Sequence, residues 1–225
     1  MIKATDIVKR YDSLEVLKGI SLEIASGEVM TIVGPSGAGK STLLHILGSL
    51  DRPDRGKVEI DGADIFALPD NALARLRNSR IGFVFQFHRL LPEFTLRENV
   101  AMPALIGGVA HDKAFAEADR LIAYLGLQQR VDHNPSPLSG GERQRAAVAR
   151  ALVNNPSVVF ADEPSGSLDS QNRRELHRLF FDLRRDFGHT FVIVTHDESL
   201  AADSDRIVHM ADGLIREIII NQKHH

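Results

Sequence analysis

The sequence contains no cysteine, no excess of basic residues and no long uninterrupted apolar run. The absence of cysteine excludes disulfide bonds and suits a reducing compartment. Lysine and arginine number 27 against 30 aspartates and glutamates, so the net charge of −3 offers no basic surface of the kind that binds nucleic acid. No segment approaches the roughly 18 apolar residues of a membrane span. We therefore expect no nucleic-acid partner and a chain that reaches a membrane only through another subunit.

The start and the length of the chain indicate a single unit. Asp6 places an acidic side chain where a signal peptide would need an apolar stretch. With 225 residues the chain can bury one substantial core, and residues 1–225 are expected to form one compact, two-lobed unit. His224 and His225 resemble the remnant of a purification tag and are left out of the functional interpretation.

A glycine-rich segment carries the strongest chemical signal. Residues 34–41 match the pattern G-x-x-x-x-G-K-[ST], follow the β-rich run 29–33 and precede the helical pattern 41–50. In that context the glycines let backbone N–H groups approach the phosphates of a nucleotide. Lys40 is expected to reach the β- and γ-phosphates, and Ser41 to ligate Mg²⁺. The predicted cofactors are ATP and Mg²⁺, and the predicted contacts are Gly34, Pro35, Ser36, Gly37, Ala38, Gly39, Lys40, Ser41 and Thr42.

Further candidate site residues follow two short apolar runs, each of which is typical of a buried parallel strand. The run 157–161 ends in Asp162 and Glu163, and the run 191–194 is followed closely by His196. Open α/β sheets bind ligands at the carboxyl ends of their strands. Asp162 is the expected Mg²⁺ partner, through water, and Glu163 is positioned to polarise the attacking water. His196 is expected to contact the γ-phosphate or position that water, so Glu163, His196 and Lys40 form the predicted catalytic set.

Gln86 and Tyr11 complete the predicted contacts within one chain. Gln86 follows the strand 81–85 and is a plausible sensor of the γ-phosphate and of Mg²⁺. Tyr11 is one of two tyrosines and comes just after the first strand. Its ring either stacks on adenine or packs against the protein.

The segment Leu138-Ser139-Gly140-Gly141-Glu142 is a second phosphate-binding element. Ser139 and Glu142 have the spacing of a capping box, and an alanine-rich helical run, 146–153, follows. The two glycines leave backbone N–H groups bare at a helix N-terminus, which is an anion site. One chain with two such elements predicts that two copies close around shared nucleotides. The predicted contacts are Ser139, Gly140, Gly141 and Glu142.

The order of the remaining elements defines the fold class. The first 28 residues and the run 57–60, with a turn at Asp61-Gly62, predict an antiparallel β layer. Residues 97–153 are helical in pattern, with a helix over 111–126; a helix over 171–187, a strand over 190–195 and a β pair around 212–213 follow. We predict an α/β P-loop NTPase (RecA-like) core, residues 1–88 and 157–225, that includes this β layer and carries an inserted helical lobe, residues 89–156.

Taken together, these motifs resemble, in their order and over essentially the whole chain, the ATP-binding subunit of ABC transporters. The resemblance implies the ABC ATPase fold, Mg·ATP hydrolysis at a shared dimer interface and a membrane partner that is driven by it. It also implies that Asp169, in Ser167-Leu168-Asp169, makes a contact across the dimer. The chain departs from the usual pattern in having Ser165-Gly166-Ser167 where Thr-Gly-Asn is common, and Glu142 where many members have Gln.

Three segments are similar to the lipoprotein-releasing (Lol-type) subgroup, namely 43–48, 86–95 and 98–103. That similarity implies release of lipoproteins from a bacterial inner membrane, driven from its cytoplasmic face. The related MacB-type efflux ATPases and FtsE-type cell-division ATPases share much of the pattern and remain alternatives. A chromosome-maintenance or DNA-repair ATPase usually needs a long coiled-coil or zinc insertion, and residues 41–139 have no sustained heptads and no cysteine.

A short apolar segment after Gln86 has two interpretations. Its residues either pack under the helical lobe or line a groove that receives a cytoplasmic helix of a membrane permease. The predicted docking residues are Phe87, Leu90, Leu91 and Phe94, with Pro92 between them.

Overall fold

The computed structural model describes residues 1–221, so His224 and His225 lie outside the described residues. The chain forms two β-sheets. The smaller sheet is antiparallel, with the strand order β2-β1-β4-β5. Its strands are β1 (Ile2–Tyr11), β2 (Leu14–Ile24), β4 (Arg55–Ile60) and β5 (Ala63–Asp64). This sheet is the predicted antiparallel layer.

The larger sheet has the strand order β10-β9-β3-β8-β7-β6. Neighbouring strands from β9 to β6 are parallel, and β10 is antiparallel to β9. The strands are β3 (Val29–Val33), β6 (Ile81–Phe85), β7 (Val158–Asp162), β8 (Thr190–Val194), β9 (Arg206–Ala211) and β10 (Leu214–Ile220). The P-loop strand β3 therefore lies between two strands that come near the end of the chain.

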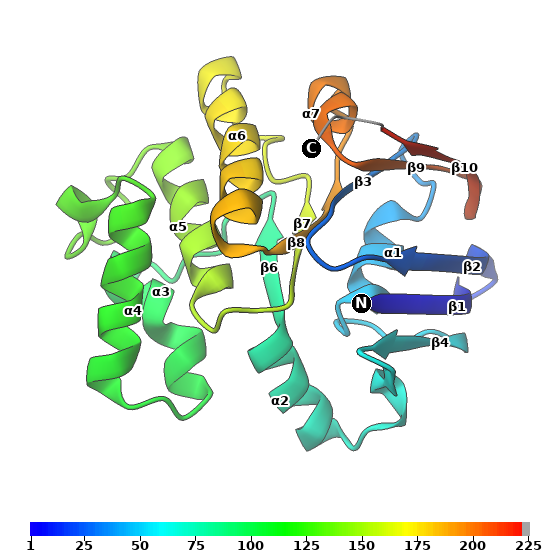
Figure 1. Cartoon of the computed structure of the whole chain (residues 1–225), viewed down its shortest axis with the longest axis horizontal. Coiled ribbons are helices and arrows are strands. Elements are labelled where there is room, and N and C mark those ends of the chain that lie inside the picture. Colours follow the sequence, from blue (N-terminus) through cyan, green and yellow to red (C-terminus); the bar gives the residue numbers. More distant parts are fainter. Residues whose placement is uncertain (222–225) are drawn as a thin grey trace.

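Seven α-helices are found among residues 1–221, and none is long and apolar enough to cross a membrane. They are α1 (Lys40–Leu47), α2 (Asp70–Arg80), α3 (Leu96–Ile106), α4 (His111–Tyr124), α5 (Gly140–Leu152), α6 (Ser170–Phe187) and α7 (Glu198–Asp203). Figure 1 shows the strands β6, β7 and β8 in the middle, with α3, α4 and α5 on one side and α1 and the antiparallel layer on the other.

The parallel strands are apolar at successive positions because both of their faces are covered. In β7, Phe160 packs in a core shared with α1 and the antiparallel layer. Its neighbours Val159 and Ala161 pack in the second core, beneath α3, α4, α5 and α6. This is the α/β architecture predicted from the sequence, a P-loop core with an antiparallel layer and an added helical lobe.

Helix α1 is shorter than predicted. It buries Leu43, Leu44, Ile46 and Leu47 and ends at Leu47, whereas the apolar pattern predicted a helix to residue 50. Gly48 follows, and a Cβ at that position would lie 2.0 Å from Cζ of Phe83. Close packing of the chain against β6 therefore favours glycine at the C-cap of α1.

Two helices were missed by the sequence analysis. Helix α2 is strongly polar, and Leu73 is its one buried residue. Helix α7 has six residues and begins at the cap Asp197, whose carboxylate accepts hydrogen bonds from the N–H groups of Ser199 and Leu200. Neither helix has the repeated apolar spacing by which helices are recognised.

Candidate ATP site

The glycine-rich loop joins β3 to α1 and exposes a helix N-terminus. Gly39 is the N-cap residue of α1, has a φ of +93° and provides no side-chain hydrogen bond to the first turn. The loop also runs close to β9, since a Cβ at Gly34 would lie 2.0 Å from the carbonyl oxygen of Met210. Uncapped N–H groups and the positive end of the helix dipole make this loop fit a phosphate.

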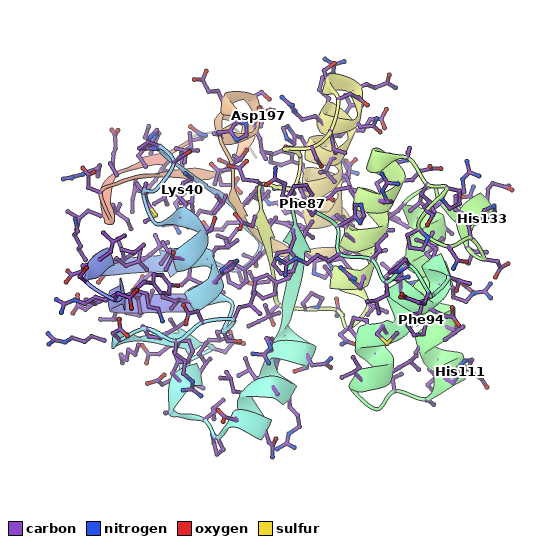
Figure 2. The ribbon with its side chains drawn as sticks, turned by 180° about the vertical axis from the view of Figure 1, so that it is seen from behind. Lys40, Phe87, Phe94, His111, His133 and Asp197 are labelled. Atoms are coloured by element: carbon purple, nitrogen blue, oxygen red, sulfur yellow. The ribbon has the colours of Figure 1, made fainter. Side chains whose placement is uncertain are left out.

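Lys40, the first residue of α1, is folded back over this loop. Its ammonium donates hydrogen bonds to the carbonyl oxygens of Gly34 and Pro35, at 2.7 and 2.9 Å. Figure 2 shows Lys40 on the opposite side of the central strands from the helical lobe. A cation held above a cradle of N–H groups is placed to meet the distal phosphates of a nucleotide.

The predicted Mg²⁺ ligands come from three elements, and two of them are in contact. The Ser41 hydroxyl donates to Oδ1 of Asp162 at 2.9 Å, and Oδ2 of Asp162 lies 3.8 Å from Nε2 of His45. Gln86 follows β6, where Phe85 is paired with Asp162 in register. Residues 1–221 contain no cluster of three or more His, Asp or Glu side chains of metal-binding form. A hydroxyl, one carboxylate and substrate phosphates suit Mg²⁺, which seldom occupies an all-protein cage.

Glu163 and His196 meet at the ends of β7 and β8. Oε2 of Glu163 lies 2.9 Å from Nδ1 of His196, but the contact lacks hydrogen-bond geometry, and this oxygen is buried without a hydrogen-bond partner. The Glu163 backbone has a φ of +46°, held by its N–H bond to the carbonyl of Val194. A strained backbone and an unpartnered buried carboxylate oxygen are features of a reactive position. The Glu163 carboxylate, beside the His196 imidazole, can accept a proton from a water that contacts it.

The predicted second phosphate-binding element has the expected capping box. The Ser139 hydroxyl accepts the Glu142 N–H at 3.2 Å, and the Ser139 N–H donates to Oε2 of Glu142 at 2.7 Å. Arg130 donates to the other carboxylate oxygen at 2.9 Å. The Ser139 N–H and then Arg130 lower the pKa of Glu142 to about 2. Glu142 thus holds the cap in place, and the N-terminus of α5 lies across the central strands from α1 (Figure 1).

Asp169 serves a local role in the described chain. It is the N-cap of α6 and accepts hydrogen bonds from the N–H groups of Gln171 and Asn172 and from the Asn172 side chain. The Asn172 N–H is the largest of the effects that lower the pKa of Asp169. Its predicted contact across a dimer stays a prediction.

Tyr11 is not packed in the core, since its side chain is 47% exposed. Its hydroxyl donates to Asp51 at 2.6 Å, and this bond is the largest of the effects that raise the pKa of Tyr11. The Thr42 side chain acts on the same hydroxyl, so the ring lies beside the N-terminal turn of α1. Stacking on adenine stays a prediction.

The apolar segment after Gln86 is divided between core and surface. Phe87, Leu91 and Phe94 are exposed by 70%, 41% and 37%, whereas Leu90 is buried in the core of the lobe. The prediction that Leu90 takes part in docking is therefore wrong. The side-chain amide of the buried Asn99 fixes the backbone of this segment by hydrogen bonds at Leu91, Phe94 and Thr95.

A hydrogen bond that joins α5 to the end of β6 was missed by the sequence analysis. Gln144, on α5, is buried and donates to the carbonyl oxygen of Phe85 at 2.9 Å. It therefore ties α5, whose N-cap is Ser139, to the end of β6, which Gln86 follows. A glutamine at an inward position of a helix was the available signal, because buried amides need partners.

Fold and loop together define the class of protein, a P-loop ATPase cassette with an inserted helical lobe. The ABC transporter family model matches residues 17–166. The "Lipoprotein-releasing system ATP-binding protein LolD" of Bacteroides fragilis is 59% identical over 96% of this chain and 100% of its own length. The protein of that description from Porphyromonas gingivalis is 60% identical over 96% of this chain and 98% of its own. The solved "Dimeric structure of a post-hydrolysis state of the ATP-binding cassette MJ0796 bound to ADP and Pi" is similar, with a TM-score of 0.91, 36% identity and full coverage of both chains. The chain belongs to the ABC transporter family.

Proposed function

We propose that this chain is the ATP-hydrolysing subunit of a transporter that releases lipoproteins from the inner membrane of a bacterium. The observation that carries the proposal is the near-complete alignment, at 59% and 60% identity, with two proteins described as ATP-binding subunits of lipoprotein-releasing systems. The meeting of Glu163 and His196 beside the Ser41–Asp162 pair supports the hydrolytic part.

The site residues have separate roles in this proposal. The loop 34–42 binds the phosphates through backbone N–H groups and Lys40, with Tyr11 against adenine. Ser41, Asp162 and Gln86 would hold Mg²⁺, which when bound neutralises charge on the phosphates. Glu163 takes a proton from the attacking water, and His196 orients that water toward the γ-phosphate.

A second copy of the chain completes the site. The cap formed by Ser139, Gly140 and Gly141 closes on the γ-phosphate bound by the other copy, and closure excludes water. The relative of known structure is described as dimeric, which supports this arrangement. In each copy the helical lobe, residues 89–156, moves against the core formed by residues 1–88 and 157–225.

The membrane partner is an integral permease, and the chain works at the cytoplasmic face of the membrane by binding it. Phe87, Leu91 and Phe94 provide exposed apolar contacts on a fixed backbone. Beside them a hollow of about 400 Å³ lies between α2, β6, α3 and α5. Arg150 lines this hollow and donates to the carbonyls of His88 and Arg89, so the hollow and the segment form one surface. We propose that this surface receives a cytoplasmic helix of the permease.

Docking at this surface predicts that Leu91→Glu and Phe94→Glu separate hydrolysis from partner binding. A carboxylate buried in an apolar contact costs about 2 kcal/mol or more, so affinity for the permease should fall at least about tenfold. The test is coexpression with candidate permeases and copurification, with hydrolysis by the isolated chain measured in parallel. Ile220→Glu is the control, because Ile220 is also exposed but lies on β10, across the molecule from the lobe (Figure 1). Copurification of both folded variants at the wild-type level would exclude this docking surface.

The transported substrate is tested by identifying the membrane protein that copurifies with the wild-type chain. Lipoprotein release predicts a permease whose complex with this chain frees lipoproteins from proteoliposomes when ATP is added. The Glu163→Gln complex should bind the same permease without release. A complex with efflux or cell-division membrane proteins, and none with a lipoprotein-releasing permease, would contradict the proposal.

A further inference from the structure

The turn that follows Glu163 is anchored to α6 by a buried pair of polar side chains. Ser165 is 3% exposed, and its hydroxyl lies 3.1 Å from Nε2 of His177, which is 7% exposed and belongs to α6. A buried hydroxyl and a buried imidazole nitrogen each need a partner, and these two provide it for one another. The pair therefore fixes the position of residue 165 relative to α6.

The same turn carries Glu163 and contacts Gln86. The Glu163 carbonyl accepts the Gly166 N–H at 3.0 Å, and the Ser165 carbonyl accepts the Leu168 N–H at 3.1 Å, so residues 163–168 form a tight unit. The Ser167 hydroxyl lies 3.4 Å from the carbonyl oxygen of Gln86. A Cβ at Gly166 would lie 3.1 Å from Nε2 of Gln86. A displacement of Ser165 should therefore also displace Glu163 and Gln86.

Helix α6 also contacts the loop that carries His196. The charge of Asp197 acts on the imidazole, against the burial that lowers the pKa of His177. Arg173, one turn earlier on α6, lies 3.6 Å from the Asp197 carboxylate. One face of α6 thus supports both loops whose side chains meet as Glu163 and His196.

We propose that His177 is a positioning residue for ATP hydrolysis, acting through Ser165 to hold the turn that carries Glu163 and contacts Gln86. This inference rests on the proposed role of Glu163. The side chain at residue 165 thus has a dedicated partner on α6.

The test compares four variants of the full chain by kcat, KM for ATP and Tm. Ser165→Ala removes the hydroxyl alone, and His177→Leu removes the imidazole while keeping apolar volume. We expect each to lower kcat roughly tenfold while KM is retained, as for a small misplacement of reacting groups. The loss of kcat in the double variant should equal that of the more impaired single variant and stay below the sum of the two losses, because both changes remove one contact. His177→Gln, whose amide can reach the Ser165 hydroxyl, should recover most of kcat.

His189→Leu is the matched control. His189 is equally buried, at 6% exposure, but its Nδ1 lies 3.1 Å from the carbonyl of Pro156, at the opposite end of β8 from His196. We expect this variant to lower Tm and leave kcat unchanged.

Wild-type kcat in Ser165→Ala, or additive losses in the double variant, would overturn the proposal. If His177→Leu does not fold, Ser165→Ala with the KM and kcat comparison decides the question alone. Glu163→Gln in the same assay distinguishes failure of the positioning role from failure of the proposed function. A low kcat for Glu163→Gln with a normal kcat for Ser165→Ala contradicts only the positioning role, whereas a normal kcat for Glu163→Gln contradicts the proposed function itself.

Discussion

Replacement of Glu163 by glutamine should leave ATP binding intact and lower turnover by roughly 10² or more, the range seen when general-base catalysis is lost. Glutamine keeps the size and polarity of the side chain but cannot accept the proton of the attacking water. The buried oxygen Oε2, 2.9 Å from His196, is the atom that the substitution neutralises. With hydrolysis blocked, the variant should accumulate as an ATP-bound dimer.

Turnover is measured by steady-state phosphate release, ATP binding by titration with a fluorescent nucleotide, and dimer formation by size-exclusion chromatography with ATP. Glu198→Gln is the control, since it makes the same change of charge on an exposed side chain two residues beyond His196. Near-normal hydrolysis by Glu163→Gln would show that this carboxylate is not the base.

Damage to the two phosphate-binding elements should have different effects. Lys40→Ala should weaken ATP binding by the isolated chain roughly tenfold or more, because it removes a charge-assisted contact. A carboxylate in the cap at residues 139–141 should lower hydrolysis by roughly 10² or more while monomer affinity is kept, because the cap acts on the other copy's nucleotide.

The choice of glycine matters for this comparison. Gly141→Asp is unsuitable, because a Cβ at Gly141 would lie 2.0 Å from Oδ1 of Asn172 and would disturb the cap of α6. At Gly140 the nearest atom, Cδ2 of Leu168, is 3.5 Å away, an ordinary contact. Gly140→Asp therefore tests charge, and Gly140→Asn is the uncharged control of the same shape.

Mixing the two variants gives the decisive measurement. A dimer of one Lys40→Ala copy and one Gly140→Asp copy has one site with an intact loop and an intact cap. Hydrolysis should therefore recover in part on mixing, to a rate above that of either variant alone. No recovery in demonstrated mixed dimers, or equal loss of monomer ATP binding in both variants, would contradict a shared site.

The parts of the fold that could be predicted are those that follow from local pattern. The strands around Asp162 and His196 were recognised because both faces are buried and the runs are continuously apolar. The capping box at Ser139 was recognised because its two hydrogen bonds join residues three apart. The same logic missed α2, whose one buried residue is Leu73.

What escaped the sequence depends on contacts between distant segments. Leu90 and Leu91 are chemically alike but differently buried, and Asn99, eight residues beyond Leu91, holds the backbone there by a hydrogen bond. The pairing of Ser165 with His177 joins a loop to a helix face and has no periodic signature. The bond from Gln144 to Phe85 spans 59 positions, so only the assembled fold makes it visible.

The sheet order has a consequence for synthesis of the chain. Strand β3, which ends at Val33 and leads into the phosphate-binding loop, has β8 and β9 as its neighbours in the sheet formed by residues 1–221, and β8 begins at Thr190. At ~5–20 residues per second, a ribosome needs roughly 10–30 s to make the intervening chain. During that interval the apolar segment Val29–Val33 has neither of its strand neighbours and depends on other parts of the nascent chain, or on a chaperone, for cover. The nucleotide-binding loop is thus among the first segments to be translated and among the last to reach its final structure.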